Sequence, residues 1–333
     1  MRALRCTKLL LRQRLCTSVS TRGLRSLPSD VQQRVGVIGL GQMGGRMADN
    51  LRKHGRQLVV CDPEPANVQR QLAQGGAVAV ASPKEVAEQC DTIITMLPST
   101  AIVERVYLGD DGVHEALRSE HLLLDSSTID PIFTKKLSEE LHERGATFVD
   151  APVSGGVAGA QNGTLTFMVG GELEEFERVK PLLTAMGKNL VHCGGSSTGQ
   201  IAKLCNNLAA AIQLTSIAEA TNLGVALGID PKVLAEVMNS STSRCWSSTA
   251  NHPYPGIIPD IPASGGYDGG FAVQLMRKDL GLASSSAMRA EVYVPLTNAV
   301  LQLFNMMVNQ GNGHKDFAYI LPFLKGGTTE QQQ

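Results

Sequence analysis

Cysteine and histidine are too scattered in this 333-residue sequence to suggest a metal centre. Seven of each are present, and no C-x-x-C or H-E-x-x-H spacing occurs among them. Zinc ribbons and zinc peptidases depend on such spacings. The pattern therefore favours reduced thiols, and we expect no metal.

Long apolar runs are also missing. The most apolar stretch, near residues 199–228, is broken by polar residues such as Lys203 and Glu219, so it falls short of the roughly 18 apolar residues of a membrane span. We expect a soluble mature protein with no membrane segment.

Acidic residues are absent from residues 1–29, which hold seven of the 30 lysines and arginines. The remaining chain has 23 basic against 31 acidic residues, so the overall net charge of -1 hides an acidic remainder. Such a chain has no bulk electrostatic attraction for nucleic acid or for an acidic membrane surface. We expect neither as a partner.

The composition of residues 1–29 is typical of a mitochondrial transit peptide. The segment is rich in Arg, contains Ser and Thr, and has only a short apolar run at residues 9–11, whereas a secretory signal needs a longer apolar core. A disordered basic tail is the alternative. We predict that these residues direct the protein to the mitochondrial matrix.

A glycine-rich turn follows the first apolar strand, predicted at residues 35–38, and opens a helix that ends near Gly55. Strand, G-x-G-x-x-G turn and helix in this order are typical of dinucleotide binding. The first glycine permits the tight turn, the second lets the backbone approach a pyrophosphate, and the third allows close packing. The predicted cofactor contacts in this turn are Gly39, Leu40, Gly41, Gln42, Met43 and Gly44.

Asp62 ends the second predicted strand, residues 57–62, and lies 23 residues after Gly39. An acid at this spacing can accept hydrogen bonds from the adenosine ribose, and it repels a 2′-phosphate. The sequence therefore predicts NAD as the cofactor in preference to NADP.

Further strands predicted at 91–98, 121–128 and 147–150 alternate with helical stretches, which indicates a doubly wound parallel sheet of the Rossmann type. Ligands of such sheets lie beyond the carboxyl ends of the strands. Leu97, Pro98 and Thr128 are expected there. Pro98 could instead only end a strand, and Thr128 could cap the next helix.

The segment Ser154-Gly155-Gly156 follows the last of these strands. Its backbone N–H groups can converge on one point, and such a nest suits a carboxylate or phosphate oxygen. A flexible glycine turn is the alternative. A strand at 164–170, a helix at 172–186 and a strand at 189–193 then lead into a long helix, after which the chain is predicted to be helical.

The long helix, residues 199–228, has Lys203 and Glu219 as its only charges. Gly199, Lys203 and Asn207 are four residues apart, so they lie on one face. Gly199 allows a close approach, Lys203 can give or take a proton, and Asn207 can hold an oxygen. The alternative is a lysine that reaches solvent beside a capping amide.

The segments "GLGQMG", "DAPVSGG", "GQIAKLCNN" and "KDLGLA" occur in this order, and together they resemble the β-hydroxyacid dehydrogenase family. The resemblance covers essentially residues 34–325. Four further segments, "DSSTIDP", "GTLTFMVGG", "RCWSS" and "GGF", resemble the branch that acts on 3-hydroxyisobutyrate in mitochondrial valine breakdown.

The resemblance implies an NAD-dependent oxidation of a small 3-hydroxyacid, 3-hydroxyisobutyrate, to methylmalonate semialdehyde. It assigns proton transfer to Lys203, substrate contact to Asn207, and positions beside the nicotinamide to Thr128 and Lys278. Relatives often carry Asn a few residues after "LP", where this sequence has Ile102, so that cofactor contact stays unassigned.

The resemblance further implies that Ser154, Gly155 and Gly156 receive the substrate carboxylate, and that the protein is a homo-oligomer, a dimer or a tetramer.

Burial or the Lys278 charge would lower the pKa of Lys203, whereas a bound carboxylate would raise it. The sequence leaves the balance open.

Two other functions remain open. One is an NADPH-dependent reductase of glyoxylate or succinic semialdehyde, which shares the fold and the lysine but would favour a basic residue in place of Asp62. The other is a non-enzymatic dinucleotide-binding reader, in which the lysine is lost.

The predicted organisation is a transit peptide at 1–29, an NAD-binding Rossmann domain at 30–196, and an all-helical substrate and oligomerisation domain at 197–328.

Overall fold

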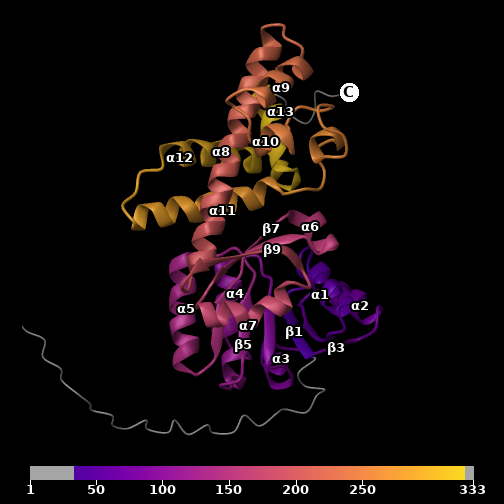
Figure 1. Cartoon of the computed structure of the whole chain (residues 1–333), viewed down its shortest axis with the longest axis vertical. Coiled ribbons are helices and arrows are strands. Elements are labelled where there is room, and N and C mark those ends of the chain that lie inside the picture. Colours follow the sequence, from indigo (N-terminus) through magenta and orange to yellow (C-terminus); the bar gives the residue numbers. More distant parts are fainter. Residues whose placement is uncertain (1–33, 327–333) are drawn as a thin grey trace, which may run out of the picture.

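The computed structural model describes residues 34–326, which form a sheet domain and a helical domain connected by one long helix. The predicted transit peptide lies outside the described residues. In Figure 1 the sheet domain is indigo to magenta, and the helical domain above it is orange to yellow. The boundary predicted between residues 196 and 197 falls between the last strand and the long helix.

The sheet has nine strands in the order β3-β2-β1-β4-β5-β6-β8-β7, with β9 beside β8. Strands β1 to β6 all pair in parallel. The strands are β1 (Arg34–Ile38), β2 (Gln57–Cys61), β3 (Ala77–Ala79), β4 (Thr92–Thr95), β5 (Leu122–Asp125), β6 (Thr147–Asp150), β7 (Val153–Ser154), β8 (Leu165–Gly170) and β9 (Gly187–Gly194).

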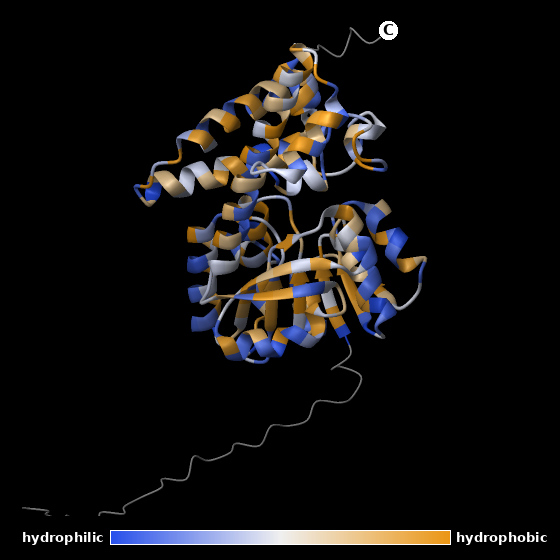
Figure 2. Ribbon diagram, turned by 45° about the horizontal axis from the view of Figure 1, so that its top comes forward, coloured by the Kyte–Doolittle hydropathy of each residue, from blue (hydrophilic) through white to orange (hydrophobic). Residues whose placement is uncertain are grey.

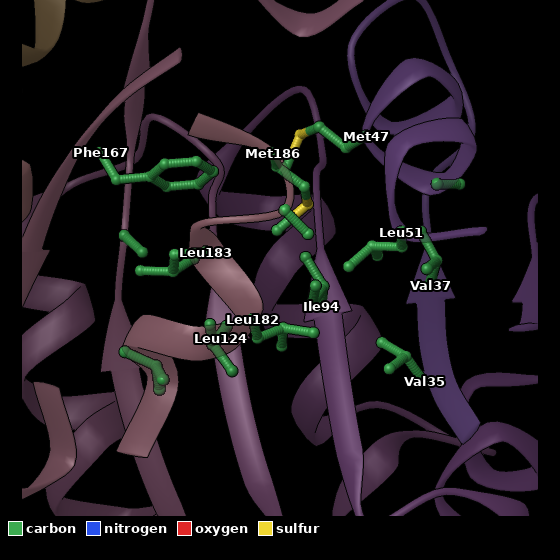
Figure 3. Packing of buried hydrophobic residues seen from close by; sticks show 14 of the residues in the cluster. Val35, Val37, Met47, Leu51, Ile94, Leu124, Phe167, Leu182, Leu183 and Met186 are labelled. Carbon is green, nitrogen blue, oxygen red and sulfur yellow. The ribbon is translucent and has the colours of Figure 1, made fainter. Parts of the chain in front are cut away.

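Helices cover both faces of this sheet, so the predicted doubly wound fold is confirmed. Figure 3 shows one face, where Met47 and Leu51 of α1 and Leu182 of α7 converge with side chains of β1, β4 and β5. The helices of this domain are α1 (Gly44–Lys53), α2 (Pro65–Leu72), α3 (Pro83–Gln89), α4 (Thr100–Leu108), α5 (Pro131–Glu143), α6 (Gly156–Asn162) and α7 (Leu173–Leu183), with a 3₁₀ helix η2 (Val113–Ala116).

The sheet departs from a purely parallel one after β6. Strand β8 runs antiparallel to β6 and to the two-residue strand β7, with Val153 opposite Phe167. A parallel return usually needs a crossover that spans the sheet face. The connection here holds only β7 and the seven-residue α6, so β8 returns beside β6 in the opposite direction.

The long helix α8 (Thr198–Ala226) passes from the sheet domain into the helical domain (Figure 1). There it packs with α11 and α13 around a third apolar core that includes Leu214, Leu280 and Phe304. The remaining helices are α9 (Pro231–Ser240), α10 (Trp246–Thr249), α11 (Val273–Arg289), α12 (Pro295–Asn309) and α13 (Ile320–Leu324), with 3₁₀ helices η3 (Pro262–Gly265), η4 (Asn312–His314) and η5 (Phe317–Tyr319).

Hydropathy differs between the two domains. Figure 2 shows predominantly hydrophobic strands inside the sheet domain, whereas the helical domain carries hydrophobic residues on its outer helices as well. Leu227 of the helical domain, for example, is 79% exposed. Among the described residues, no helix has both the length and the apolar content needed to cross a bilayer.

Candidate active site

The glycine-rich turn is shaped by the two glycines at its ends. Gly39 has a φ of 92°, and a Cβ there would lie 2.4 Å from the Met96 carbonyl oxygen. A Cβ on Gly44 would lie 1.9 Å from the Gly39 carbonyl oxygen, so close packing requires glycine at both positions. A Cβ on Gly41 would meet no atom within 4 Å. Of these three glycines, only the middle one has open space around it; it lies beside the N-terminus of α1, a position that favours an anion, and its contact with a pyrophosphate stays a prediction.

Asp62 lies directly after β2 and reaches the same turn. Its Oδ2 accepts a hydrogen bond of 2.6 Å from the Leu40 N–H, and its Oδ1 accepts from the Glu64 N–H and the Asn67 amide. A carboxylate has about four lone-pair sites, so capacity for ribose hydroxyls remains. The predicted acid is therefore held at the open side of the turn.

The ends of β4 and β5 are connected by side chains. The Ser127 hydroxyl accepts from the Leu97 N–H at 2.8 Å, and Lys278 Nζ on α11 donates to the Thr128 carbonyl at 2.7 Å and more weakly to the Pro98 carbonyl at 3.4 Å. The structure thus brings together Leu97, Pro98, Thr128 and Lys278, four of the predicted cofactor contacts.

Thr128 does not cap the following helix. Asp130 caps α5, because its carboxylate accepts from the N–H groups of Ile132 and Phe133. The capping alternative for Thr128 is therefore wrong, and its side chain is available for another role.

The start of α8 is fixed by Asp150, the last residue of β6. Its carboxylate accepts hydrogen bonds from the N–H groups of Ser197 and Gln200, at 2.7 and 2.8 Å. A Cβ on Gly199 would lie 2.3 Å from the Met168 carbonyl oxygen and 2.8 Å from Asp150 Oδ2. Gly199 is therefore approached closely by the protein's own strands, β8 through Met168 and β6 through Asp150.

Lys203 is buried one turn further along α8, with 6% of the residue exposed. Its Nζ donates to Asn207 Oδ1 at 3.1 Å, and Asn207 Nδ2 donates to Asp279 Oδ2 at 2.6 Å. Asn207 is equally buried, so the lysine does not reach solvent and the amide does not cap a helix end. Lys203, Asn207 and Asp279 form a buried chain, here called the lysine chain.

Burial lowers the pKa of Lys203 to about 8. The Asp279 carboxylate opposes this shift and the Lys278 ammonium adds to it. Asp279 Oδ1 lies 3.3 Å from Lys278 Nζ but accepts no aligned hydrogen bond, so the carboxylate keeps free acceptor capacity inside the site. A neutral amine at Lys203 is thus accessible near physiological pH, as a proton acceptor requires.

The segment at residues 154–156 lies where β7 meets α6, at the edge of the sheet domain that faces the helical domain (Figure 1). Gly155 and Gly156 both have positive φ, 129° and 61°, which other residues rarely adopt. No described hydrogen bond joins Ser154 or these glycines to the lysine chain. The structure therefore shows a tight glycine turn here, and the convergence of its N–H groups on a carboxylate stays a prediction.

Asp279 was missed by sequence reasoning, although it is the neighbour of Lys278 in "KDLGLA". It lies 72 residues from Asn207 in the chain, so only the tertiary fold brings the two together. Residues 34–326 contain no group of three or more His, Cys, Asp or Glu side chains placed to hold a metal ion.

Comparison with known proteins adds a family. Residues 34–195 match the model for the NAD binding domain of 6-phosphogluconate dehydrogenase. Residues 197–324 match the model described as "NAD-binding of NADP-dependent 3-hydroxyisobutyrate dehydrogenase". A probable mitochondrial 3-hydroxyisobutyrate dehydrogenase of Dictyostelium discoideum is 47% identical over 91% of this chain and 94% of that one. The chain belongs to the 3-hydroxyisobutyrate dehydrogenase family.

Two further proteins align with most of this chain. An NAD-dependent L-serine dehydrogenase of Pseudomonas aeruginosa is 43% identical over 86% of this chain and 96% of that one. The structure of a Mycobacterium tuberculosis 3-hydroxyisobutyrate dehydrogenase with L-serine aligns with a TM-score of 0.83 at 34% identity, covering 88% of this chain and 99% of that chain. The predicted fold, the oxidoreductase class and the NAD cofactor are confirmed by this membership.

Proposed function

We propose that the protein oxidises the primary alcohol of 3-hydroxyisobutyrate to methylmalonate semialdehyde. The reaction moves a hydride from the hydroxyl-bearing carbon and a proton from its oxygen. NAD, when bound, accepts the hydride. The observation that carries the proposal is the buried lysine chain, since it supplies a proton acceptor beside the two strand ends that Lys278 links.

Lys203 Nζ is the proposed proton acceptor. Its lowered pKa leaves a useful fraction of neutral amine, and burial excludes the water that would compete for the proton. Asn207 aims the lysine, because its carbonyl oxygen accepts from Nζ while its N–H group is held by Asp279. The amide has two N–H donors and only one of them is bound to Asp279, so the other can donate to a substrate oxygen.

Ser154, Gly155 and Gly156 are the proposed carboxylate site. The positive φ values turn backbone N–H groups of this segment away from ordinary strand or helix directions, which suits an anion. A fixed carboxylate would orient the reacting carbon and so raise the rate by positioning.

Asp62 supports NAD over NADP. A 2′-phosphate would meet a carboxylate that is already fixed by Leu40 and Asn67, so it could not turn away easily. This argues against the NADPH-dependent reductase, and the presence of Lys203 argues against a reader without catalysis.

The test is a substrate panel followed through NADH formation by the full chain. We expect turnover of 3-hydroxyisobutyrate with NAD, and weak turnover with NADP. The methyl ester keeps the alcohol and loses the charge, so its kcat/KM should fall about 100-fold or more, equivalent to roughly 3 kcal/mol. Equal turnover of acid and ester would contradict the carboxylate site.

L-serine belongs in the same panel, because it is also a 3-hydroxyacid and a relative is an L-serine dehydrogenase. We expect 3-hydroxyisobutyrate to have the higher kcat/KM. A higher kcat/KM for L-serine would support the proposed oxidation of a 3-hydroxyacid but would identify L-serine as the preferred substrate.

We further propose a mitochondrial matrix location and a homo-oligomer. Relatives that match most of the chain are named mitochondrial, and residues 1–29 have the composition of a transit peptide.

The helical domain exposes apolar side chains that a second copy of the chain would cover; they include Leu223, Leu227, Val233, Val237, Met288, Tyr293 and Leu296. Reporter import by residues 1–29 and the mass in solution are the respective tests.

A further inference from the structure

Gln200 is fully buried in the first turn of α8, and both ends of its side-chain amide are used. Its Nε2 donates to the Ser127 carbonyl at 2.7 Å, and its Oε1 accepts from the Ile129 N–H at 3.1 Å. We call these two hydrogen bonds the Gln200 bridge. The bridge connects the helix that holds Lys203 to the loop after β5.

The two residues that Gln200 binds, Ser127 and Ile129, directly precede and follow Thr128 in the chain. The Thr128 carbonyl between the two bridged residues accepts from Lys278 Nζ at 2.7 Å. Three consecutive residues, Ser127, Thr128 and Ile129, therefore each have a main-chain group bound to a side chain of α8 or α11. The loop cannot move relative to α8 without breaking these bonds.

The bridge lies close to the proton acceptor. Gln200 precedes Lys203 by three residues, which is about 4.5 Å along the helix axis. The N–H of Gln200 itself is bound to Asp150, so this turn of α8 is fixed at its backbone as well as at its side chain. The Gln200 bridge and the first turn of α8 thus connect Lys203 to the Thr128 loop as one short rigid unit.

We propose that Gln200 is a positioning residue, which sets the separation between the Thr128 loop and Lys203 and thereby the rate of the chemical step. The inference rests on the proposed function, in which the Thr128 loop lies beside the nicotinamide. Hydride and proton transfer both depend steeply on distance, so a shift of about 1 Å could cost about 100-fold.

Gln200→Met tests the bridge, because methionine has a similar length and shape and forms neither bond. We expect kcat per NADH-binding site to fall about 10- to 100-fold, while KM for 3-hydroxyisobutyrate and the Kd for NADH change less than about threefold. Counting NADH-binding sites by titration removes the effect of misfolded protein. Gln213→Met is the matched control, since Gln213 is half-buried further along the same helix and lies outside the bridge.

Gln200→Glu gives a readout that a purely structural role would not move. A protonated glutamic acid can donate to the Ser127 carbonyl and accept from the Ile129 N–H, whereas a carboxylate cannot donate. Burial and the neighbouring Asp150 carboxylate raise the pKa of a glutamate here. The variant should therefore approach the unmodified protein at low pH and lose activity relative to it as the pH rises.

The comparison is a ratio of the two kcat values at each pH. The charged groups around the bridge are Asp125, Asp150, Lys203 and Lys278. A carboxylate at position 200 would also raise the pKa of Lys203, so the ratio is compared at low pH and well above pH 8, where the lysine is neutral in both proteins. A ratio that is high at low pH and stays low well above pH 8 supports the bridge, whereas a ratio that recovers there reports only the charge of Lys203. This measurement also decides the matter if Gln200→Met folds poorly.

Either of two results would overturn the proposal. One is a Gln200→Met variant whose kcat per site stays within about twofold of the unmodified protein; the other is a Gln200→Glu ratio that does not vary with pH or that recovers well above pH 8. Failure of the proposed function gives a different result, because the unmodified protein would then form no NADH from any hydroxyacid.

Discussion

The two domains contribute different chemical groups to the site. The sheet domain supplies mostly main-chain groups, namely the open turn at Gly41 and the carbonyls of Pro98 and Thr128. The helical part supplies buried charged side chains, chiefly Lys203 and Asp279. Substitutions in the sheet domain should therefore act through backbone shape and cofactor affinity, and those in the helical part through protonation and rate.

The largest expected effect is that of Lys203→Met. Loss of the proton acceptor should lower kcat by about 10² to 10⁴, while the Kd for NADH stays within severalfold, because the residue is assigned to the alcohol proton. Steady-state kinetics and NADH titration measure the two quantities. A variant that keeps more than about a tenth of the rate would show that another group accepts the proton.

Gly44→Ala tests the sheet domain. The new Cβ would lie 1.9 Å from a backbone carbonyl, so the turn must shift, and we expect at least about tenfold weaker NAD binding together with a lower Tm. Gly41→Ala is the matched control, because its Cβ meets no protein atom. It should leave Tm unchanged and weaken NAD binding alone. Unchanged NAD binding in Gly41→Ala would place the pyrophosphate elsewhere.

Asp62→Ala should have a smaller effect, on cofactor choice. Removal of the carboxylate removes both the ribose acceptor and the repulsion of a 2′-phosphate, so the preference for NAD over NADP should narrow by about tenfold. The ratio of kcat/KM values for the two cofactors measures it. An unchanged ratio would assign the selectivity to another residue.

The smallest expected effect of a substitution is that of Asp279→Asn on the pH profile. Lys203 must be neutral to accept a proton, so kcat/KM for oxidation should be high above pH 8 and fall about tenfold per unit below it. Asp279→Asn removes the charge that raises the pKa of Lys203, so the fall should move to lower pH. A shift to higher pH would mean that Asp279 acts mainly by another route.

Local patterns in the sequence predicted the parallel part of the sheet domain. The order of strand, glycine turn, helix and acid predicted both the turn and the position of Asp62, because each signal depends on neighbours in the chain. The antiparallel return at β8 was not predicted, since strand direction depends on how far the intervening segment reaches. Family resemblance, and not spacing, supplied Lys278, which meets Thr128 from 150 residues away.

For the lysine chain, the helical spacing of Lys203 and Asn207 was predictable and the pKa of the lysine was not. That pKa is a sum of burial, the Asp279 charge and the Lys278 charge, and two of these come from a helix 70 residues further on. Gln200 carried no signal in the sequence beyond a glutamine in an apolar helix, because its partners are main-chain groups of another segment.

The length of α8 has a mechanical consequence. Its 29 residues form a rod of about 43 Å, and Asp150 fixes it to the sheet at one tip. A rotation of the helix by about 5° about this fixed end would move its other end by about 4 Å. Lys203 lies only about 7.5 Å from the fixed end, so the same rotation would move it by about 0.6 Å. Lys203 therefore lies near the fixed end of α8, where a given rotation of the helix displaces it least.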